Sequence, residues 1–352
     1  MISKLPKKVW LKTILQEKSN LKKAMGSLEK SHAQIILVVN KKMQLLGTIT
    51  DGDIRRSILN KISLETDIIK IMNPKPYYVH ENIPKDHALS FMKQNQLKNI
   101  PFVSSKKIVK GLYMLGSYIE ENKKKKNNKI SNSFVIMAGG KGSRMKPLTN
   151  KIPKALLNLN NKPMILHIIN KAKEEGFYNF TISINYLGEQ IKNYLGNGDK
   201  YGVNINYIEE KKYLGTAGSL KYLKLSGKPF IVCNCDIISD ISFKSILEFH
   251  KKRKSHATMA MRVYEHKNPY GVLETRGYKI KKIIEKQTLI HKVNAGIYVM
   301  NENIIKFIKR NQYMDMTKLF EKIERKFVYP TFEDWDDVGN IYRYEEINSR
   351  KK

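Results

Sequence analysis

Apolar and polar positions alternate along the chain in two different patterns, which divide it near residue 130. Before that point, an amphipathic helical segment is followed by two short apolar strands and a second helix, and this order occurs twice. From residue 131 onward, short apolar strands alternate with helical segments over about 220 residues. That alternation predicts an α/β domain built on a mixed, mainly parallel sheet, preceded by a smaller α+β domain.

The first pattern is an internal repeat with a period of 64 residues. At this shift, residues 36–39 align with residues 100–103, and residues 47–49 align with residues 111–113, without a gap. One copy of about 60 residues cannot bury both faces of a small sheet, whereas two stacked copies can. The repeat therefore predicts one domain formed by two copies stacked on each other.

The predicted domain boundaries follow from these patterns. We expect the repeat pair to occupy residues 1–122, with copies at about 1–62 and 63–122. A segment rich in Lys and Asn, residues 123–132, has the composition of a linker. Residues 133–352 form the second domain, in which no hexapeptide repeat predicts an attached β-helix.

The chain is strongly basic. Its 352 residues include 65 Lys and Arg against 32 Asp and Glu, which gives a formal net charge of +33. The lysines outnumber the arginines and are scattered, whereas proteins that read phosphates and bases by geometry use more Arg. We therefore expect a solvated basic surface and no nucleic-acid partner.

The composition also bears on the compartment. No apolar run approaches the roughly 18 residues of a membrane-spanning helix, and no apolar stretch of a signal peptide follows the basic N-terminus. Two cysteines, Cys233 and Cys235, are too few for a disulfide framework or a full zinc site, and their spacing on a strand favours packing roles. We expect a cytoplasmic protein without a membrane partner.

A glycine-rich loop directly after an apolar strand carries the strongest chemical signal. Gly139, Gly140 and Gly142 let backbone N–H groups approach phosphates. The loop has neither the Gly-Lys-Ser/Thr of a P-loop nor the third glycine of the dinucleotide fingerprint. Arg144 closes it instead, and Lys154 follows a proline ten residues later. A planar guanidinium and a second fixed cation suit a triphosphate whose pyrophosphate leaves.

This arrangement resembles the sugar-1-phosphate nucleotidylyltransferase family over about residues 131–340. Further motifs follow in the family's order: Tyr213-Leu-Gly-Thr-Ala-Gly, Cys233-Asn-Cys-Asp, Tyr270-Gly-Val, Glu285-Lys, Asn294-Ala-Gly and Trp335-Asp-Asp-Val-Gly. The residues of these motifs are similar to those of bacterial guanylyltransferases of mannose, heptose and glucosamine type. The resemblance implies a Rossmann-like domain that transfers a nucleoside monophosphate, preferably from GTP, to a sugar 1-phosphate. The products are pyrophosphate and a nucleotide sugar for surface-glycan biosynthesis.

The resemblance also implies a role for each matching residue. It implies nucleotide binding by Ala138, Gly139, Gly140, Gly142, Ser143, Gly215, Thr216 and Gly218. It implies catalytic roles for Arg144, Lys154 and Lys286, and Mg²⁺ ligation by Asp236 and Asp337. It implies sugar binding by Tyr270, Gly271, Glu285, Asn294 and Gly296. Asp336 is the alternative ligand if the register differs by one residue, and Gln287 stands where the family has proline.

The residue types suit these roles. Asp236 follows an apolar strand, and ligands of open α/β sheets bind at the carboxyl ends of strands. Mg²⁺ is a hard cation that prefers carboxylate and phosphate oxygens. Because a sugar phosphate is already an anion, its attack on the α-phosphorus needs no general base. Catalysis then consists of positioning and charge neutralisation.

The repeat pair resembles the CBS domain pair, a regulatory module found on many enzymes. The most specific match is residues 47–56, and the resemblance implies that Thr50 and Asp53 hold the ribose of an adenine nucleotide. Both residues also suit a helix start, so a purely structural module remains the alternative. Met114 and Ser117 align with them in the second copy, which therefore lacks the ribose site.

The sequence leaves other functions open. The chain could be a catalytically inactive sensor or scaffold that binds adenine nucleotide, although retention of all five catalytic and metal-binding charges argues against this. It could also be a thymidylyl-, uridylyl- or cytidylyltransferase. We further expect a homo-oligomer, either a dimer or a tetramer.

Overall fold

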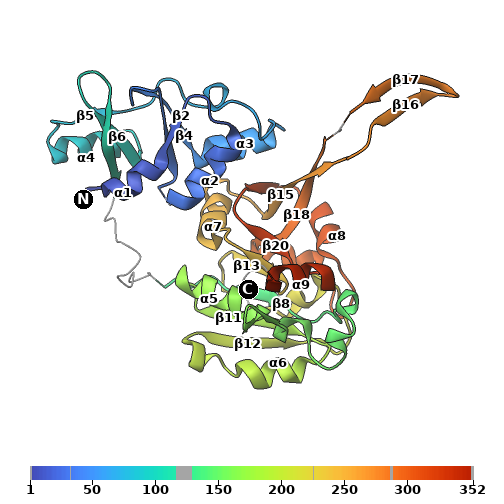
Figure 1. Cartoon of the computed structure of the whole chain (residues 1–352). Coiled ribbons are helices and arrows are strands. Elements are labelled where there is room, and N and C mark those ends of the chain that lie inside the picture. Colours follow the sequence, from blue (N-terminus) through green and yellow to red (C-terminus); the bar gives the residue numbers. More distant parts are fainter. Residues whose placement is uncertain (1, 32, 116–128, 225, 286–287, 350–352) are drawn as a thin grey trace. The chain divides into compact units, whose positions relative to one another are not determined.

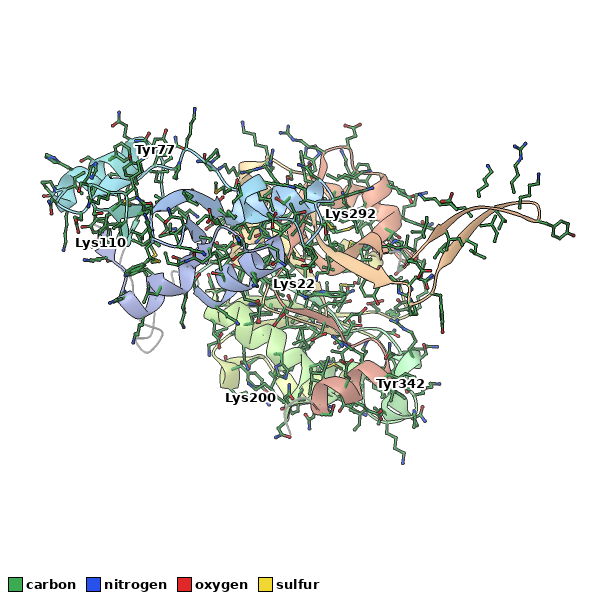
Figure 2. All side chains as sticks on the ribbon, turned by 45° about the horizontal axis from the view of Figure 1, so that its top comes forward. Lys22, Tyr77, Lys110, Lys200, Lys292 and Tyr342 are labelled. Carbon is green, nitrogen blue, oxygen red and sulfur yellow. The ribbon has the colours of Figure 1, made fainter. Side chains whose placement is uncertain are left out.

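The chain forms two compact units, Met1–Lys126 and Asn127–Lys352. The computed structural model, shown in Figure 1, describes residues 2–31, 33–115, 129–224, 226–285 and 288–349. Across these ranges, no helix is long and apolar enough to cross a membrane. Several lysines labelled in Figure 2 are exposed, as expected for a solvated basic surface: Lys22, Lys110 and Lys200.

The first unit contains two small sheets, each built mainly from one repeat, and a strand of the first copy, β1 (Ile2–Lys4), joins the sheet of the second copy. In each copy, a parallel strand pair is followed by an antiparallel pair. The first sheet contains β2 (Ile14–Gln16), β3 (Ile35–Val39) and β4 (Leu45–Thr50). The second contains β1 (Ile2–Lys4), β7 (Val109–Leu115), β6 (Asn99–Val103) and β5 (Val79–His80). The helices are α1 (Lys7–Trp10), α2 (Leu21–Ser31), α3 (Asp51–Leu59) and α4 (Lys85–Gln94).

The two copies meet through a pair of equivalent hydrogen bonds. Leu45 N donates to Lys107 O, and Val109 N donates to Met43 O, each at 2.9 Å. Donors and acceptors are both related by the 64-residue shift, so the contact has approximate two-fold symmetry. Apolar residues of both copies also share one buried cluster. The stacked arrangement explains how two sheets of three or four strands become stable together.

The second unit is built on a seven-stranded sheet. The prediction of a mixed, mainly parallel sheet is confirmed, because β18 alone runs antiparallel to both of its neighbours in this sheet. In spatial order, the strands are β12 (Asn204–Glu209), β11 (Asn179–Ile184), β8 (Phe134–Met137), β13 (Phe230–Asn234), β18 (Thr288–Met300), β15 (Ala257–Lys267) and β19 (Lys326–Thr331).

Helices cover both faces of this sheet. Phe134 and Ile136 of β8 pack in a cluster with residues of α5 (Met164–Glu174), α6 (Gly188–Leu195) and α7 (Phe243–Lys252). Val135 points to the opposite face and packs with α8 (Met316–Glu321). Because successive strand side chains alternate between faces, a continuous apolar run such as β8 suits a strand buried on both sides.

Short paired strands surround the main sheet, with α9 (Ile341–Ser349) near the C-terminal end. The pairs are β9 (Asn158–Leu159) with β10 (Lys162–Pro163), β14 (Ile237–Ser239) with β20 (Trp335–Asp337), and β16 (Val272–Arg276) with β17 (Lys279–Ile284).

Part of the expected linker belongs to the second unit. Of residues 123–132, the first six lie outside the described residues. Ile130 N donates to Gly176 O at 2.8 Å, and Asn132 Nδ2 donates to Pro229 O at 2.6 Å. Residues 129–132 therefore belong to the second unit, because their polar groups are satisfied by it.

Candidate functional site

A cavity of about 540 Å³ lies at the carboxyl ends of β8 and β13. This is where ligands bind in open α/β sheets, because the loops that follow neighbouring strands diverge there. The cavity brings together many predicted nucleotide-binding and catalytic residues from separate segments. Those that line it are Gly139, Gly140, Gly142, Ser143, Arg144, Lys154, Gly215, Thr216 and Asp236.

The glycine-rich loop needs its small residues for steric reasons. Gly142 has a φ of 60°, in the left-handed region that favours glycine, and Thr149 Oγ1 donates to its carbonyl oxygen at 2.9 Å. A Cβ on Gly139 would lie 2.8 Å from Glu210 Oε1. The loop therefore passes close to the opposite wall of the cavity. Ala138, which was predicted to bind nucleotide, is buried behind this loop and does not line the cavity.

Two carboxylates from distant parts of the chain meet at the edge of the cavity. β14 pairs with β20, with Ile237 opposite Asp337, and Val338 N donates to Asp236 O at 3.0 Å. Lys154 Nζ lies 2.5 Å from Asp236 Oδ2. A short strand pair thus positions the acidic residues beside a buried cation.

Arg144 completes this charge cluster. A Cβ on Gly339 would lie 2.8 Å from Asp337 Oδ1 and 3.3 Å from Arg144 Nη2, so the guanidinium and the carboxylate flank the same glycine. Two cations and two carboxylates from distant parts of the chain lie together here. This cluster of charged side chains can bind a polyphosphate together with a divalent cation.

The charge cluster fits the predicted metal. Asp337 is exposed at the rim, yet the surrounding protein removes part of its hydration and raises its pKa, and the Asp236 carboxylate raises the pKa further. Lys154 and Arg144 act in the opposite direction. Two neighbouring carboxylates with hard oxygen donors are the ligand set that Mg²⁺ prefers.

Asp336 and the two cysteines are poorer candidates for metal ligation. Asp336 forms an ion pair with Arg343 of α9, which already engages its carboxylate. Cys233 and Cys235 are buried, and burial raises the pKa of Cys235 to about 12. Since the thiolate is the ligand form of cysteine, both side chains serve as packing residues, as expected.

A second loop forms the wall opposite the glycine-rich loop. Gly215 has a φ of 80°, and a Cβ there would lie 2.6 Å from Met314 O. Thr216 Oγ1 accepts a hydrogen bond from Met316 N at 2.8 Å, which ties the loop to the start of α8. Gly218 does not line the cavity but begins a 3₁₀ turn, Gly218–Tyr222. The turn ends before Leu223, whose backbone is extended.

Glu210 is a cavity residue that the sequence analysis missed. It is 7% exposed, Ser183 Oγ donates to its Oε1 at 2.7 Å, and Leu214 N donates to its Oε2 at 2.8 Å. Burial raises the pKa of Glu210, and the two donors offset part of this shift. Glu210 directly follows β12, and the position of an acidic residue at the carboxyl end of a strand was the available signal.

The predicted sugar-binding residues fall into two groups. Gly296 has a φ of 71° and donates through its N–H to Asn294 Oδ1 at 3.0 Å. A Cβ on Gly296 would lie 3.1 Å from Asn234 Nδ2, so this group adjoins the cavity wall. The other group lies on β16–β17 and its approach, where a Cβ on Gly271 would lie 2.9 Å from Glu285 Oε1.

The β16–β17 group is not joined to the cavity by the contacts of the described residues. Tyr270 is 76% exposed, and neither Gly271 nor Glu285 lines the cavity. Lys286, the third predicted catalytic cation, lies outside the described residues.

The residues predicted to bind ribose in the first unit form a helix cap. Thr50 is the N-cap of α3, and its Oγ1 accepts from Asp53 N at 3.3 Å. Asp53 Oδ2 accepts from both Thr50 N, at 2.8 Å, and Thr50 Oγ1, at 2.6 Å. Arg56 pairs with the other carboxylate oxygen. The capping alternative describes this geometry, and ribose binding stays a prediction.

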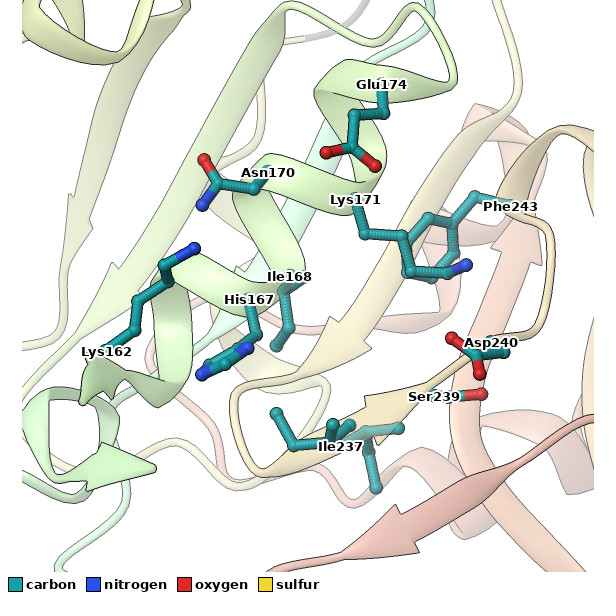
Figure 3. A pocket seen from close by; sticks show the side chains of 11 residues that line it. Lys162, His167, Ile168, Asn170, Lys171, Glu174, Ile237, Ser239, Asp240 and Phe243 are labelled. Carbon is teal, nitrogen blue, oxygen red and sulfur yellow. The ribbon is translucent and has the colours of Figure 1, made fainter. Parts of the chain in front are cut away.

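A smaller cavity of about 290 Å³ lies between α5 and β14 (Figure 3). Its charged side chains are largely engaged within the protein. His167 Nε2 lies 2.8 Å from Leu159 O, and Lys171 Nζ lies 3.6 Å from Glu175 Oε1 and 5.8 Å from the ring centre of Phe243. None of the predicted site residues lines it. The larger cavity is therefore the candidate active site.

Comparisons with known proteins match this second unit. The family described as nucleotidyl transferase matches residues 133–352. Mannose-1-phosphate guanylyltransferase 1 of Arabidopsis thaliana is 36% identical over 225 residues, which are 60% of this chain and 62% of the relative. The mannose-1-phosphate guanyltransferase of Saccharomyces cerevisiae is 33% identical over 218 residues, 58% of this chain and 60% of the relative. The chain thus spans about three fifths of the length of these curated relatives.

Solved structures support the same fold. HddC from Yersinia pseudotuberculosis superposes with a TM-score of 0.51 at 23% identity and covers 63% of this chain and 100% of that chain. The structure of HddC complexed with GMP-PN gives a TM-score of 0.50 at 22% identity, with the same coverage. These likenesses show a mixed α/β fold with a mostly parallel central sheet.

Proposed function

The chain belongs to the nucleotidyl transferase family, and on that premise we propose that it transfers a nucleoside monophosphate from a nucleoside triphosphate to a sugar 1-phosphate. Pyrophosphate and a nucleotide sugar are the products. One observation carries this proposal: Arg144, Lys154, Asp236 and Asp337 converge on one cavity beside a glycine-rich loop. Each of these residue types is common in proteins. Together, the two cations suit a triphosphate and the two carboxylates suit the divalent cation that accompanies it.

The chemistry follows from this charge distribution. The backbone of the glycine-rich loop binds the phosphates, and Arg144 stabilises the leaving pyrophosphate through a planar pair of donors. Lys154 neutralises charge near the α-phosphate, since its ammonium already lies against Asp236. Asp236 and Asp337 would hold Mg²⁺, which supplies charge stabilisation to the phosphoryl oxygens. The sugar phosphate attacks as an anion, and Lys286 is proposed to hold it.

Glu210 and the relatives together favour GTP as the donor. Guanine presents its N1–H and its N2 amino group as neighbouring donors, and a carboxylate is the side chain that accepts from both. Glu210 lines the cavity beside the Gly215 loop, and each of its oxygens retains a lone pair after bonding Ser183 or Leu214. The relatives named as mannose-1-phosphate guanylyltransferases support mannose 1-phosphate as the first acceptor to test, ahead of hexosamine and heptose phosphates.

A substrate panel tests this proposal. The full-length protein is incubated with each of four nucleoside triphosphates and with mannose, glucosamine or heptose 1-phosphate, and pyrophosphate release and product mass are measured. GTP with one of these sugar phosphates should give product, and the Asp236→Asn variant should reduce turnover by about 10²–10³. A clear preference for CTP, UTP or dTTP would refute the guanylyl assignment, and no product with any pair would refute the transferase.

Glu210→Gln provides a second test of the base. The amide keeps the size of the side chain but replaces one acceptor with a donor. We expect the KM for GTP to rise at least tenfold with a smaller change for the sugar phosphate. Equal effects on both KM values would indicate a general distortion of the cavity instead of base recognition.

We also propose that the first unit is a regulatory CBS pair that binds one adenine nucleotide. The 64-residue repeat, the equivalent hydrogen bonds between its copies and the position of Thr50 and Asp53 at a helix start support this. Coupling to the active site would change substrate affinity by about 5–150-fold. Calorimetric titration with AMP and ATP, followed by kinetics with each, tests it. Absence of binding would leave the structural alternative.

A further inference from the structure

Four hydrogen bonds hold Glu210 in place at the wall of the larger cavity. Its backbone N–H donates to Ile184 O at 2.9 Å, and Asn185 Nδ2 donates to its backbone oxygen at 2.6 Å. Ser183 Oγ and Leu214 N donate to the two carboxylate oxygens at 2.7 Å and 2.8 Å. The side chain therefore has one defined orientation, in which it lines the cavity.

Ser183 occupies a position in β11 that suits an apolar side chain. It lies between two isoleucines that belong to the buried cluster on one face of the sheet, so its own side chain points to the other face. Its cross-strand partners there are Ile208 and Met137. Ser183 is 0% exposed. Because a buried hydroxyl is unfavourable unless it is hydrogen bonded, its donation to Glu210 is what makes serine acceptable at this position.

The two side-chain donors favour the ionised form of Glu210. A carboxylate accepts from both a hydroxyl and a backbone N–H, whereas a protonated carboxyl places its own hydrogen against one of these donors. Burial raises the pKa of Glu210, and the hydrogen bonds from Ser183 and Leu214 oppose this shift. Without the Ser183 hydroxyl, the Glu210 carboxyl would be protonated at a higher pH.

Other titratable groups surround Glu210. Those that line the same cavity are Lys141, Arg144, Lys154, Tyr213, Cys235 and Asp236. Tyr213 lies on the loop that follows Glu210, where Lys211 and Lys212 are exposed. Burial raises the pKa of Tyr213 most, and the carboxylates of Asp315 and Glu210 raise it further. Tyr213 therefore stays neutral in the pH range in which a carboxyl titrates.

We propose that Ser183 is a positioning residue for base recognition, which holds the Glu210 carboxylate ionised and in one orientation so that both oxygens accept from guanine. This inference rests on the proposed function, because it concerns the donor nucleotide of that reaction. Guanine presents N1–H and the N2 amino group side by side, and each donor needs its own acceptor. Adenine presents an acceptor at N1 instead, which an ionised carboxylate repels.

Calorimetric titration of the full-length protein with GTP and with inosine triphosphate tests this role, since inosine lacks the N2 amino group. The titrations are repeated at a series of pH values for the wild type, Ser183→Ala and Ser183→Thr. Ser183→Ala should weaken GTP binding about tenfold at neutral pH and reduce the preference for GTP over inosine triphosphate. The loss should increase as the pH falls, because the Glu210 carboxyl of this variant is protonated at a higher pH. Ser183→Thr keeps the hydroxyl and should restore both properties.

Ser219→Ala is the matched control, because Ser219 is also 0% exposed and its hydroxyl lies 4.0 Å from the sulfur of Met137. It should bind GTP like the wild type, and urea unfolding should show that all variants are folded. Unchanged GTP affinity in Ser183→Ala would overturn the inference. Equal weakening at every pH with an unchanged preference for GTP would also overturn it, because Ser183 would then be only structural. Both outcomes leave the transferase intact, whereas a wild type that binds no GTP and forms no product refutes the proposed function as well.

Discussion

Lys154→Met isolates the cation at the centre of the candidate active site. The Lys154 side chain is 10% exposed and the Asp236 side chain is 17% exposed, with Nζ and Oδ2 at 2.5 Å. Methionine keeps most of the aliphatic packing and removes the charge. If Lys154 neutralises the reacting phosphates, turnover should fall by about 10²–10³, which corresponds to roughly 2.7–4 kcal/mol of transition-state stabilisation.

The same substitution has a separate effect on stability. A hydrogen bond to a charged group contributes about 1.5–3 kcal/mol, and breaking a fully buried ion pair costs about 3–5 kcal/mol. Because Asp236 borders an open cavity, we expect the lower range for the free energy of unfolding. Lys154 also lowers the pKa of Asp337, so its loss should shift the acid limb of the turnover profile to higher pH.

The assay is pyrophosphate release at saturating GTP and sugar phosphate, with urea unfolding measured on the same preparations. Lys151→Met is the control, since Lys151 is exposed nearby and does not line the cavity. It should change neither turnover nor stability appreciably. If Lys154→Met turns over within about tenfold of the wild type while remaining folded, the assigned role of this cation is wrong.

Three further predictions follow from other parts of the structure. The pKa of Asp337 is raised in the folded protein. At pH values between the ordinary and the raised pKa, the folded state therefore binds more protons than the unfolded state. The free energy of unfolding consequently falls as the pH rises through this range. Asp337→Asn should therefore unfold at a higher temperature than the wild type at neutral pH while losing activity, and an equal or lower unfolding temperature would contradict this. Gly215→Ala should raise the KM for GTP and destabilise the protein more than Gly227→Ala, as measured by kinetics and urea unfolding. Both glycines have positive φ, but only a Cβ at Gly215 would collide with a backbone oxygen; equal effects would contradict the argument. Thr50→Ala should lower the unfolding free energy of the first unit by about 0.5–2 kcal/mol through loss of the cap, and an unchanged unfolding curve would contradict the capping geometry.

Local features of this protein could be predicted from its sequence. The glycine-rich loop, the buried strand before it and the 64-residue repeat depend on neighbouring residues or on direct self-similarity. The type of sheet was also predictable, because apolar runs separated by helical segments leave few alternatives. The family resemblance implied that Asp236 and Asp337 bind the same metal ion, although no sequence periodicity relates residues so far apart.

Tertiary structure decided the contacts that give these residues their chemistry. The pairing of β14 with β20 brings Asp337 to Asp236, and burial turns Glu210 from an ordinary acidic residue into part of a cavity wall. It also leaves Leu273, Ile280 and Ile283 of the β16–β17 ribbon more than half exposed within the part of the chain that the structure describes. Conformational preference acts over a few residues and can be derived from composition and spacing. Proximity, loss of hydration and the fields of neighbouring charges arise only when distant segments pack, because each depends on every atom that surrounds the group.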